Sequence, residues 1–453
     1  MEGNAATGRS TRWPPRWRRG AGALAVGAAL GLVAVGCSSA GSDARTATTR
    51  PGGSPSGKGT TAGAGAGADR ATTSSAPPAV ADEYVGPVDA FYRVPDPLPK
   101  GAPGDLIRVQ QVAGGGGSAT LRVMYHSTDA TGADRAVTGI ISYPTGPAPK
   151  GGWPVISTAH GTTGIASPCA PSRRGAPYPQ WGIGHVVDAT TDYIGLGPIG
   201  ERHAYLSKVD EGNSVIDIVR AARNIPQAHA SDRWVAIGHS QGGHGALAAH
   251  ELAAERAPEL HLVATVALAP AALLDQVYGG IDPIVTAILT MMGLYGAQDE
   301  HPDVDLADYL SPEAMAKANV FDTGCLDQIT DAMVGVAMRG AFRADPRQTE
   351  PVRSMLLAQD VGTEAVDGVP LLLASGTKDD RVVIDRFLAT ARRICATGQV
   401  AEVHVVPGAT HDSVIGAEAS DVRRFVADAL AGRPATDSCR QPEAAWTDAA
   451  PGT

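Results

Sequence analysis

From residue 153 onward, short apolar runs alternate with segments of helical periodicity, and this alternation constrains the fold more than any other feature of the sequence. Apolar runs bounded by turns are typical of strands buried on both faces. Strands that alternate with helices predict a mostly parallel sheet covered on both sides. The predicted strands are 155–159, 185–189, 234–237, 262–268, 370–374 and 403–406, and the predicted helices are 214–224, 242–257, 383–393 and 420–430.

Two segments depart from this alternation. Before it, strand-like runs at 106–112, 120–126 and 137–143 are separated by polar or Gly-rich turns and predict an antiparallel opening to the sheet. After 262–268, no convincing strand occurs in residues 271–367, which we interpret as a helical cap inserted between two strands. The alternative is a run of ordinary surface helices. The helical patterns in this segment are 272–278, 283–294, 312–319 and 326–338.

The first 37 residues have the character of an export signal. Four arginines (Arg12, Arg16, Arg18 and Arg19) precede a short apolar stretch at 21–35, which ends in Ala34-Val35-Gly36-Cys37. Small residues before a cysteine are typical of a lipoprotein cleavage site, so we predict that Cys37 receives a lipid and anchors the protein at the cell surface. The alternative is ordinary cleavage nearby and free secretion. The predicted division is a signal peptide at 1–37, a Ser/Thr/Gly/Ala-rich tether at 38–81, an α/β core at 82–270 and 368–440, the cap at 271–367 and a tail at 441–453.

Charge and cysteine content exclude some partners. The net charge of −10 argues against a nucleic-acid partner, which normally requires a basic face. If Cys37 is lipidated, four cysteines remain and allow two disulfides in three connectivities, whereas buried free thiols are the alternative. These four are Cys169, Cys325, Cys395 and Cys439. No cysteine or histidine pair has metal-ligand spacing, so we expect no metal and no cofactor.

The pentapeptide Gly238-His239-Ser240-Gln241-Gly242 lies where a predicted strand meets a predicted helix. In a chain with 55 glycines, composition alone gives roughly 0.3 matches to Gly-x-Ser-x-Gly, so the pattern needs structural context. A strand, a sharp turn and a helix supply that context, because they expose the serine hydroxyl and direct the helix N-terminus toward a developing oxyanion. We therefore predict Ser240 as a nucleophile, with His239 shaping the turn.

A serine hydroxyl needs a base to take its proton, and the base needs an acid to orient it. After such a turn, the acid and then the base follow along the chain. The segment after strand 370–374 offers Asp379 or Asp380, and the Gly-x-x-Asp spacing favours Asp379. The loop after 403–406 ends in His411, the predicted base. The alternatives are a solvated acidic turn and a surface-loop histidine. Three other histidines are interpreted as packed residues: His244, His250 and His404.

An oxyanion hole requires two backbone N–H groups aimed at one point. The residue after the nucleophile, Gln241, is the first predicted donor. The loop after strand 155–159 reads His160-Gly161-Thr162-Thr163-Gly164, and its glycines let it fold closely over the site. Thr162 is the second predicted donor, and a plain Gly-containing turn is the alternative.

With these residues in place, the chain resembles the secretory lipases of yeasts and actinobacteria, which are capped α/β-hydrolases. The resemblance covers about residues 88–430. Besides the three catalytic segments and the helix at 214–224, it is carried by Asp89-Ala90-Phe91-Tyr92, Gly152-Trp153-Pro154-Val155, Cys169-Ala170-Pro171-Ser172 and Asp192-Tyr193-Ile194-Gly195-Leu196-Gly197. It implies a triad of Ser240, Asp379 and His411, a cap that forms the acyl-chain pocket and catalysis without metal. It also implies that Cys169 pairs with Cys325 and Cys395 with Cys439.

The sequence and the resemblance together predict an exported serine lipase or esterase that hydrolyses lipid esters, such as acylglycerols, through an acyl-enzyme. Two other functions use the same fold. One is an acyltransferase that acts on envelope lipids, and the other is a surface binding protein without catalytic activity. The intact serine, aspartate and histidine argue against the binding protein.

Overall fold

The computed structural model describes residues 81–276, 279 and 281–447, all within one unit of the chain, Ser74–Thr453. The predicted signal peptide, the lipidation site Cys37, nearly all of the tether and the end of the tail lie outside the described residues. None of the helices in the described part is both long and apolar enough to cross a bilayer.

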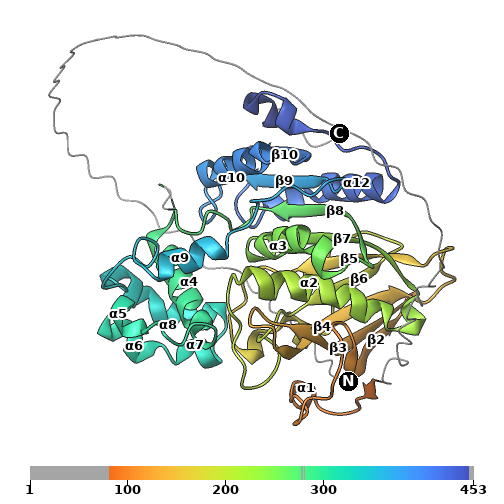
Figure 1. The fold of residues 1–453 in the computed structure, drawn as a ribbon, viewed down its shortest axis with the longest axis horizontal. Coiled ribbons are helices and arrows are strands. Elements are labelled where there is room, and N and C mark those ends of the chain that lie inside the picture. Colours follow the sequence, from red (N-terminus) through yellow and green to blue (C-terminus); the bar gives the residue numbers. More distant parts are fainter. Residues whose placement is uncertain (1–80, 277–278, 280, 448–453) are drawn as a thin grey trace, which may run out of the picture. The chain divides into compact units, whose positions relative to one another are not determined.

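A sheet of ten strands forms the centre of the described structure (Figure 1). Its order is β1-β2-β3-β4-β6-β5-β7-β8-β9-β10. The pairs β2–β3, β3–β4 and β4–β6 are antiparallel, and the other neighbours are parallel. The strands are β1 (Asp82–Glu83), β2 (Leu106–Gly115), β3 (Ser118–Thr128), β4 (Asp134–Pro144), β5 (Trp153–Ala159), β6 (Val187–Thr191), β7 (Ala230–His239), β8 (His261–Leu268), β9 (Leu371–Gly376) and β10 (Ala401–Val406).

Helices cover both faces of this sheet. Because successive side chains of a strand point to opposite faces, β7 contributes to two apolar cores. Val235 packs in the core that contains Phe387 and Phe425, whereas Trp234 packs in the core that contains Val215. The helices that carry the partners are α2 (Lys208–Arg223), α10 (Ile384–Ala396) and α12 (Ala419–Leu430), and α3 (Gln241–Arg256) contributes to both cores. Two short helices complete this part, α1 (Val88–Phe91) and α11 (Val414–Ala417).

The segment between β8 and β9 has helices but no strand among its described residues, and it has its own apolar core. Met291, Met292 and Met333 are fully buried there. In Figure 1 these helices gather beside one end of the strands. They are α4 (Pro283–Gly296), α5 (Leu306–Tyr309), α6 (Pro312–Lys317), α7 (Val320–Thr323), α8 (Leu326–Arg339) and α9 (Val352–Ala358).

One predicted helix is wrong. The described part of the predicted helix at 272–278, residues 272–276, forms no helix. Tertiary hydrogen bonds hold the backbone instead: Leu273 donates its N–H to Asp360 at 2.8 Å, and the carbonyl of Ala272 accepts from Arg386 at 2.6 Å. Leu273 has φ of +56°, which a helix does not allow. Contacts with distant residues therefore override the local helical pattern.

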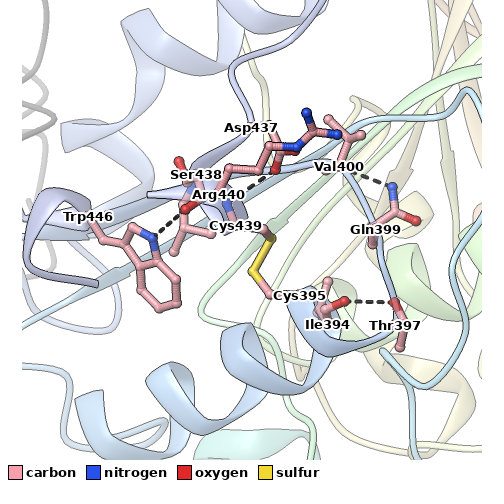
Figure 2. The surroundings of a disulfide bond; sticks show 11 residues. Ile394, Cys395, Thr397, Gln399, Val400, Asp437, Ser438, Cys439, Arg440 and Trp446 are labelled. Atoms are coloured by element: carbon pink, nitrogen blue, oxygen red, sulfur yellow. Dashed lines mark hydrogen bonds and ion pairs between the residues drawn. A yellow bond between two sulfur atoms is a disulfide. The ribbon is translucent and has the colours of Figure 1, made fainter. Parts of the chain in front are cut away.

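A disulfide between Cys395 and Cys439 fixes the end of the described chain (Figure 2). Cys395 lies in the last turn of α10, and the two Cα atoms are 5.2 Å apart. The carbonyl of the neighbouring Ser438 accepts a hydrogen bond from the indole of Trp446 at 3.0 Å, and the Ser438 Oγ accepts one from the N–H of Val403 in β10, also at 3.0 Å. The segment after α12 is thus tied to both a helix and the sheet.

Candidate active site

Ser240 lies in the sharp turn between β7 and α3. It is half-buried, and its φ of 61° is strained for a residue with a side chain. Glycine is required on both sides of it: a Cβ on Gly238 would collide with the carbonyl of Gly242, and a Cβ on Gly242 would collide with the carbonyl of Ala159. The strained turn is held by a hydrogen bond from the Ser240 N–H to Leu268 of β8 at 2.9 Å. The hydroxyl therefore sits on a rigid support.

The structure brings His411 and Asp379 together. Nδ1 of His411 lies 2.8 Å from Oδ2 and 3.0 Å from Oδ1 of Asp379, and both side chains are buried. The carboxylate also accepts the N–H groups of Arg381 and Val382 at 2.9 and 2.8 Å. Burial alone would raise the pKa of Asp379, but its hydrogen bond with His411, the charge of that ring and the two N–H donors lower the pKa below its usual value. Asp379 is therefore an ionised acceptor that orients the imidazole.

Asp380, the other candidate acid, is placed differently. The residue is exposed, and its backbone carbonyl accepts a hydrogen bond from the N–H of Asp282 at 3.4 Å. Of the two adjacent aspartates, only Asp379 contacts the histidine.

His239 connects the serine turn to His411. Its ring centroid lies 4.5 Å from that of His411, and its Nε2 donates to the His411 carbonyl at 2.7 Å. Burial and the neighbouring His411 lower the pKa of His239 to about 4, so the ring is neutral at pH 7. In the described residues no hydrogen bond joins the hydroxyl of Ser240 to His411, but His239, the residue before Ser240, contacts both the ring and the backbone of His411.

The two predicted oxyanion donors lie near the same turn. Gln241 is the first residue of α3, where a helix leaves its backbone N–H without an intrahelical acceptor. Thr162 follows Gly161, at which a Cβ would lie 3.4 Å from the His239 carbonyl. The loop after β5 thus runs close against the turn. The Thr162 hydroxyl lies 2.8 Å from the hydroxyl of Tyr205.

A disulfide joins this loop region to the helical segment between β8 and β9. Cys169 pairs with Cys325, with Cα atoms 5.3 Å apart, as the resemblance implies. The next residue, Leu326 at the start of α8, donates its N–H to the carbonyl of Thr163 at 2.9 Å. The helical segment between β8 and β9 therefore holds the backbone beside Thr162.

Sequence reasoning missed Glu211, which lies directly behind the serine turn. It is fully buried in the first turn of α2 and contacts Gln241 and His244. The predicted helix began at 214, after this residue. The signal that could have found it is Ser207-x-x-Asp210, a helix-capping pattern, since the Ser207 side chain does accept the N–H of Asp210.

The other histidines lie in buried hydrogen-bond networks. His250 contacts Thr265 and Gln399, both at 3.1 Å. His404 lies between Glu418 at 2.7 Å and Glu402 at 3.1 Å. Among the described residues, no group of three or more histidine, cysteine, aspartate or glutamate side chains is arranged to hold a metal ion.

A family model described as secretory lipase matches residues 182–438, which is more than half of the chain. The chain belongs to the secretory lipase family. The resemblance seen in the sequence is thereby confirmed, and the matched span contains Ser240, Asp379 and His411. No curated protein matches this secretory lipase.

Solved structures share the fold at low identity. Lipase A of Candida antarctica matches with a TM-score of 0.65 and 17% identity over 79% of this chain and 90% of that chain. The rice cell wall degrading esterase LipA from Xanthomonas oryzae matches with a TM-score of 0.59 and 18% identity over 70% of this chain and 92% of that chain. At these identities the likeness shows the fold, and it confirms the predicted α/β-hydrolase fold of this secretory lipase, with a mostly parallel sheet and inserted helices.

Proposed function

We propose that the protein is an exported serine lipase or esterase that hydrolyses carboxylic esters of lipids through an acyl-enzyme. The observation that carries the proposal is the buried His411–Asp379 pair beside the strained serine turn, at 2.8 Å between ring and carboxylate. Membership of the secretory lipase family supports a lipid ester as substrate. Lipase A and LipA, which share the fold, are named as a lipase and an esterase.

The reaction begins with attack of the Ser240 Oγ on the ester carbonyl carbon. The hydroxyl proton passes to Nε2 of His411, because its Nδ1 is engaged by Asp379. The negative charge that develops on the carbonyl oxygen is stabilised by the N–H groups of Gln241 and Thr162. As the tetrahedral intermediate collapses, the C–O bond to the alcohol breaks, and His411 returns the proton to the departing oxygen.

The acyl-enzyme is then hydrolysed by the same groups. A water molecule gives a proton to His411 while its oxygen attacks the acyl carbon, and the proton is returned to Ser240 as the acid leaves. Asp379 accepts no proton in this scheme. Its carboxylate fixes the tautomer of the ring and stabilises the imidazolium that forms twice in each cycle.

The helices α4–α9 form a cap over this site and contain the pocket for the acyl chain. The disulfide between Cys169 and Cys325, which ties these helices to the loop region that carries Thr162, supports this role. A rate profile over p-nitrophenyl esters of increasing acyl length measures the size of that pocket.

Ester hydrolysis by Ser240→Ala tests the proposed activity. Release of p-nitrophenol is expected to fall by about 10⁴-fold or more relative to wild type, because no other group supplies the nucleophile. Ser420→Ala is a matched control, since Ser420 is an exposed serine of α12. Equal rates in wild type and Ser240→Ala contradict the mechanism. Rates that increase with an added alcohol, with ester rather than acid as product, indicate acyl transfer instead of hydrolysis.

Lipidation of Cys37 gives the protein its place at the cell surface. In a bacterial host that processes lipoproteins, the full chain is expected in the detergent phase after cloud-point separation, and Cys37→Ser in the aqueous phase. The same distribution for both proteins indicates free secretion.

A further inference from the structure

A buried polar network lies directly behind the serine turn. Its members are His203, Glu211, Gln241 and His244, of which the most accessible is only 1% exposed. Burial of four polar side chains beside one turn is costly unless each is satisfied, so their hydrogen bonds define what the network does.

The side-chain amide of Gln241 has one orientation in this network. Its Nε2 lies 2.8 Å from Oε1 of Glu211 and 2.9 Å from Nε2 of His203. His203 donates through Nδ1 to the carbonyl of Ile194 at 2.9 Å, which leaves the lone pair of Nε2 as acceptor. Both amide hydrogens of Gln241 are therefore used, one by the carboxylate and one by the imidazole. The residue whose backbone N–H serves the oxyanion is fixed through its side chain.

Glu211 is balanced by a charged histidine. Nδ1 of His244 lies 2.7 Å from Oε2 of Glu211, and its Nε2 lies 2.8 Å from the carbonyl of Gln359. A carbonyl only accepts, and an ionised carboxylate only accepts, so both ring nitrogens carry hydrogen and His244 is an imidazolium. Burial alone would raise the pKa of Glu211, but the charge and hydrogen bond of His244, together with the neighbouring His203 ring, lower it to about 2. Burial alone would lower the pKa of His244, which the charge and hydrogen bond of Glu211 raise above its usual value.

The same carboxylate also holds the segment that contacts Thr162. Oε1 of Glu211 accepts the N–H of Leu206 at 3.0 Å, and Leu206 has φ of +63°, a strained conformation that needs external support. The residue before it, Tyr205, places its hydroxyl 2.8 Å from the hydroxyl of Thr162. One carboxylate is thus bonded directly to one oxyanion donor and through two residues to the other.

We propose that Glu211 is the positioning residue of the oxyanion hole, holding Gln241 through its side chain and Thr162 through Leu206 and Tyr205. The inference rests on the serine mechanism proposed above. It assigns no contact between Glu211 and the substrate. Its consequence is that activity depends on a side chain that lies behind the nucleophile rather than in front of it.

Glu211→Ala and Gln241→Ala test this role from two sides. Gln241→Ala keeps the backbone N–H but removes its anchor. Each variant is expected to lower kcat by about 10- to 100-fold with little change in KM, because a donor displaced from the oxyanion acts only in the transition state. Glu211→Gln is expected to recover much of the loss, since its amide oxygen can still accept from Gln241 and Leu206.

A trifluoromethyl ketone with the acyl chain of the best ester substrate separates positioning from a general loss of structure. It forms a hemiketal with the serine whose oxygen occupies the oxyanion hole, so its affinity is expected to fall by the same factor as kcat/KM. His250→Ala is the matched control. His250 lies in α3, as Gln241 does, and is equally buried, but it is hydrogen-bonded to Thr265 and Gln399, away from the serine turn. This control is expected to lose stability without loss of inhibitor affinity per titrated active site.

The outcomes are distinct. Parallel losses in kcat/KM and inhibitor affinity in Glu211→Ala and Gln241→Ala, with recovery in Glu211→Gln, support the inference. Unchanged kcat in a folded Gln241→Ala or Glu211→Ala overturns it, as does a lower kcat with unchanged inhibitor affinity. If Glu211→Ala does not fold, Gln241→Ala and Glu211→Gln decide in the same way. The Ser240→Ala assay tests the proposed function separately. If that variant hydrolyses esters as fast as wild type, the proposed function itself is overturned, whatever the Glu211 and Gln241 variants show.

Discussion

Nδ1 of His411 lies 2.8 Å from Oδ2 of Asp379, and the two side chains are only 2% and 0% exposed. This contact predicts that activity depends on the Asp379 carboxylate. Asp379→Asn is expected to lower kcat by about 10³- to 10⁴-fold, because an amide at this position favours the wrong ring tautomer. Asp380→Asn is the matched control, since that neighbour is exposed and is expected to keep nearly full activity. Steady-state hydrolysis of a p-nitrophenyl ester measures both, and a larger loss in Asp380→Asn would reverse the assignment.

The two disulfides are expected to differ in their effect on activity. Cys169→Ser/Cys325→Ser opens a connection of 156 residues, and Cys395→Ser/Cys439→Ser opens one of 44 residues. Each pair is expected to lower the free energy of unfolding by about 2–5 kcal/mol. Only the first is expected to lower kcat per titrated active site, since it releases the loop that carries Thr162. Equal kcat in both double variants would show that the loop is held without the disulfide.

The stability of the chain is expected to depend on His404 in a defined pH window. Burial alone would lower the pKa of His404, but its hydrogen bonds and ion pairs with Glu402 and Glu418 raise it to about 9. Because the folded-state pKa lies above the unfolded value, the stabilisation is complete below about pH 6.5 and is lost as pH rises through about 9.

His404→Gln is therefore expected to lower the free energy of unfolding by about 1–3 kcal/mol at pH 6 and by much less at pH 9.5. His250→Gln supplies the comparison. Burial lowers the pKa of His250 to about 4, so this ring is already neutral and its loss should cost the same from pH 7 to pH 9.5. Urea unfolding at several pH values measures both, and a pH-independent cost for His404→Gln would rule out the charged ring.

Asp210 is expected to change stability with pH in the same direction as His404, but over a lower pH range. Burial, and then the charge and hydrogen bond of Glu300, raise its pKa to about 8, so it is protonated in the fold at neutral pH. The folded state then binds more protons than the unfolded state, and stability falls as pH rises from about 4 to about 8. Asp210→Asn is expected to remove this pH dependence. Relative to wild type, its free energy of unfolding is expected to be higher at pH 8.5 than at pH 5 by on the order of 2 kcal/mol. The difference in Tm between these pH values, compared with wild type, checks it; identical slopes would contradict it.

The sequence predicted the central architecture because its pattern is local. The strand predicted at 234–237 and the helix predicted at 242–257 indicated the serine turn. The strand lies within β7, and the helix matches α3 except that it was predicted to begin and end one residue later. The helix predicted at 272–278 was wrong because Asp360 and Arg386, distant in sequence, bind its backbone. No local pattern reports such contacts.

The site was partly readable for the same reason. Loop positions after strands predicted Asp379 and His411, but adjacent aspartates could be ranked only by spacing. The structure separates them by burial and by contact with the histidine. Glu211 escaped because the first turn of α2 is polar, and its partners come from two other segments of the chain, the residues just before α2 and the start of α3. Buried polar residues break the apolar periodicity from which helices are predicted.

Covalent labelling of Ser240 tests the central claim most directly. A fluorophosphonate reacts with a serine that a neighbouring base activates, and peptide mass spectrometry locates the adduct. One adduct per chain is expected, on Ser240, with stoichiometric loss of ester hydrolysis and no labelling of Ser240→Ala. An adduct on another residue that abolishes hydrolysis, or hydrolysis that persists after Ser240 is fully labelled, would contradict this claim.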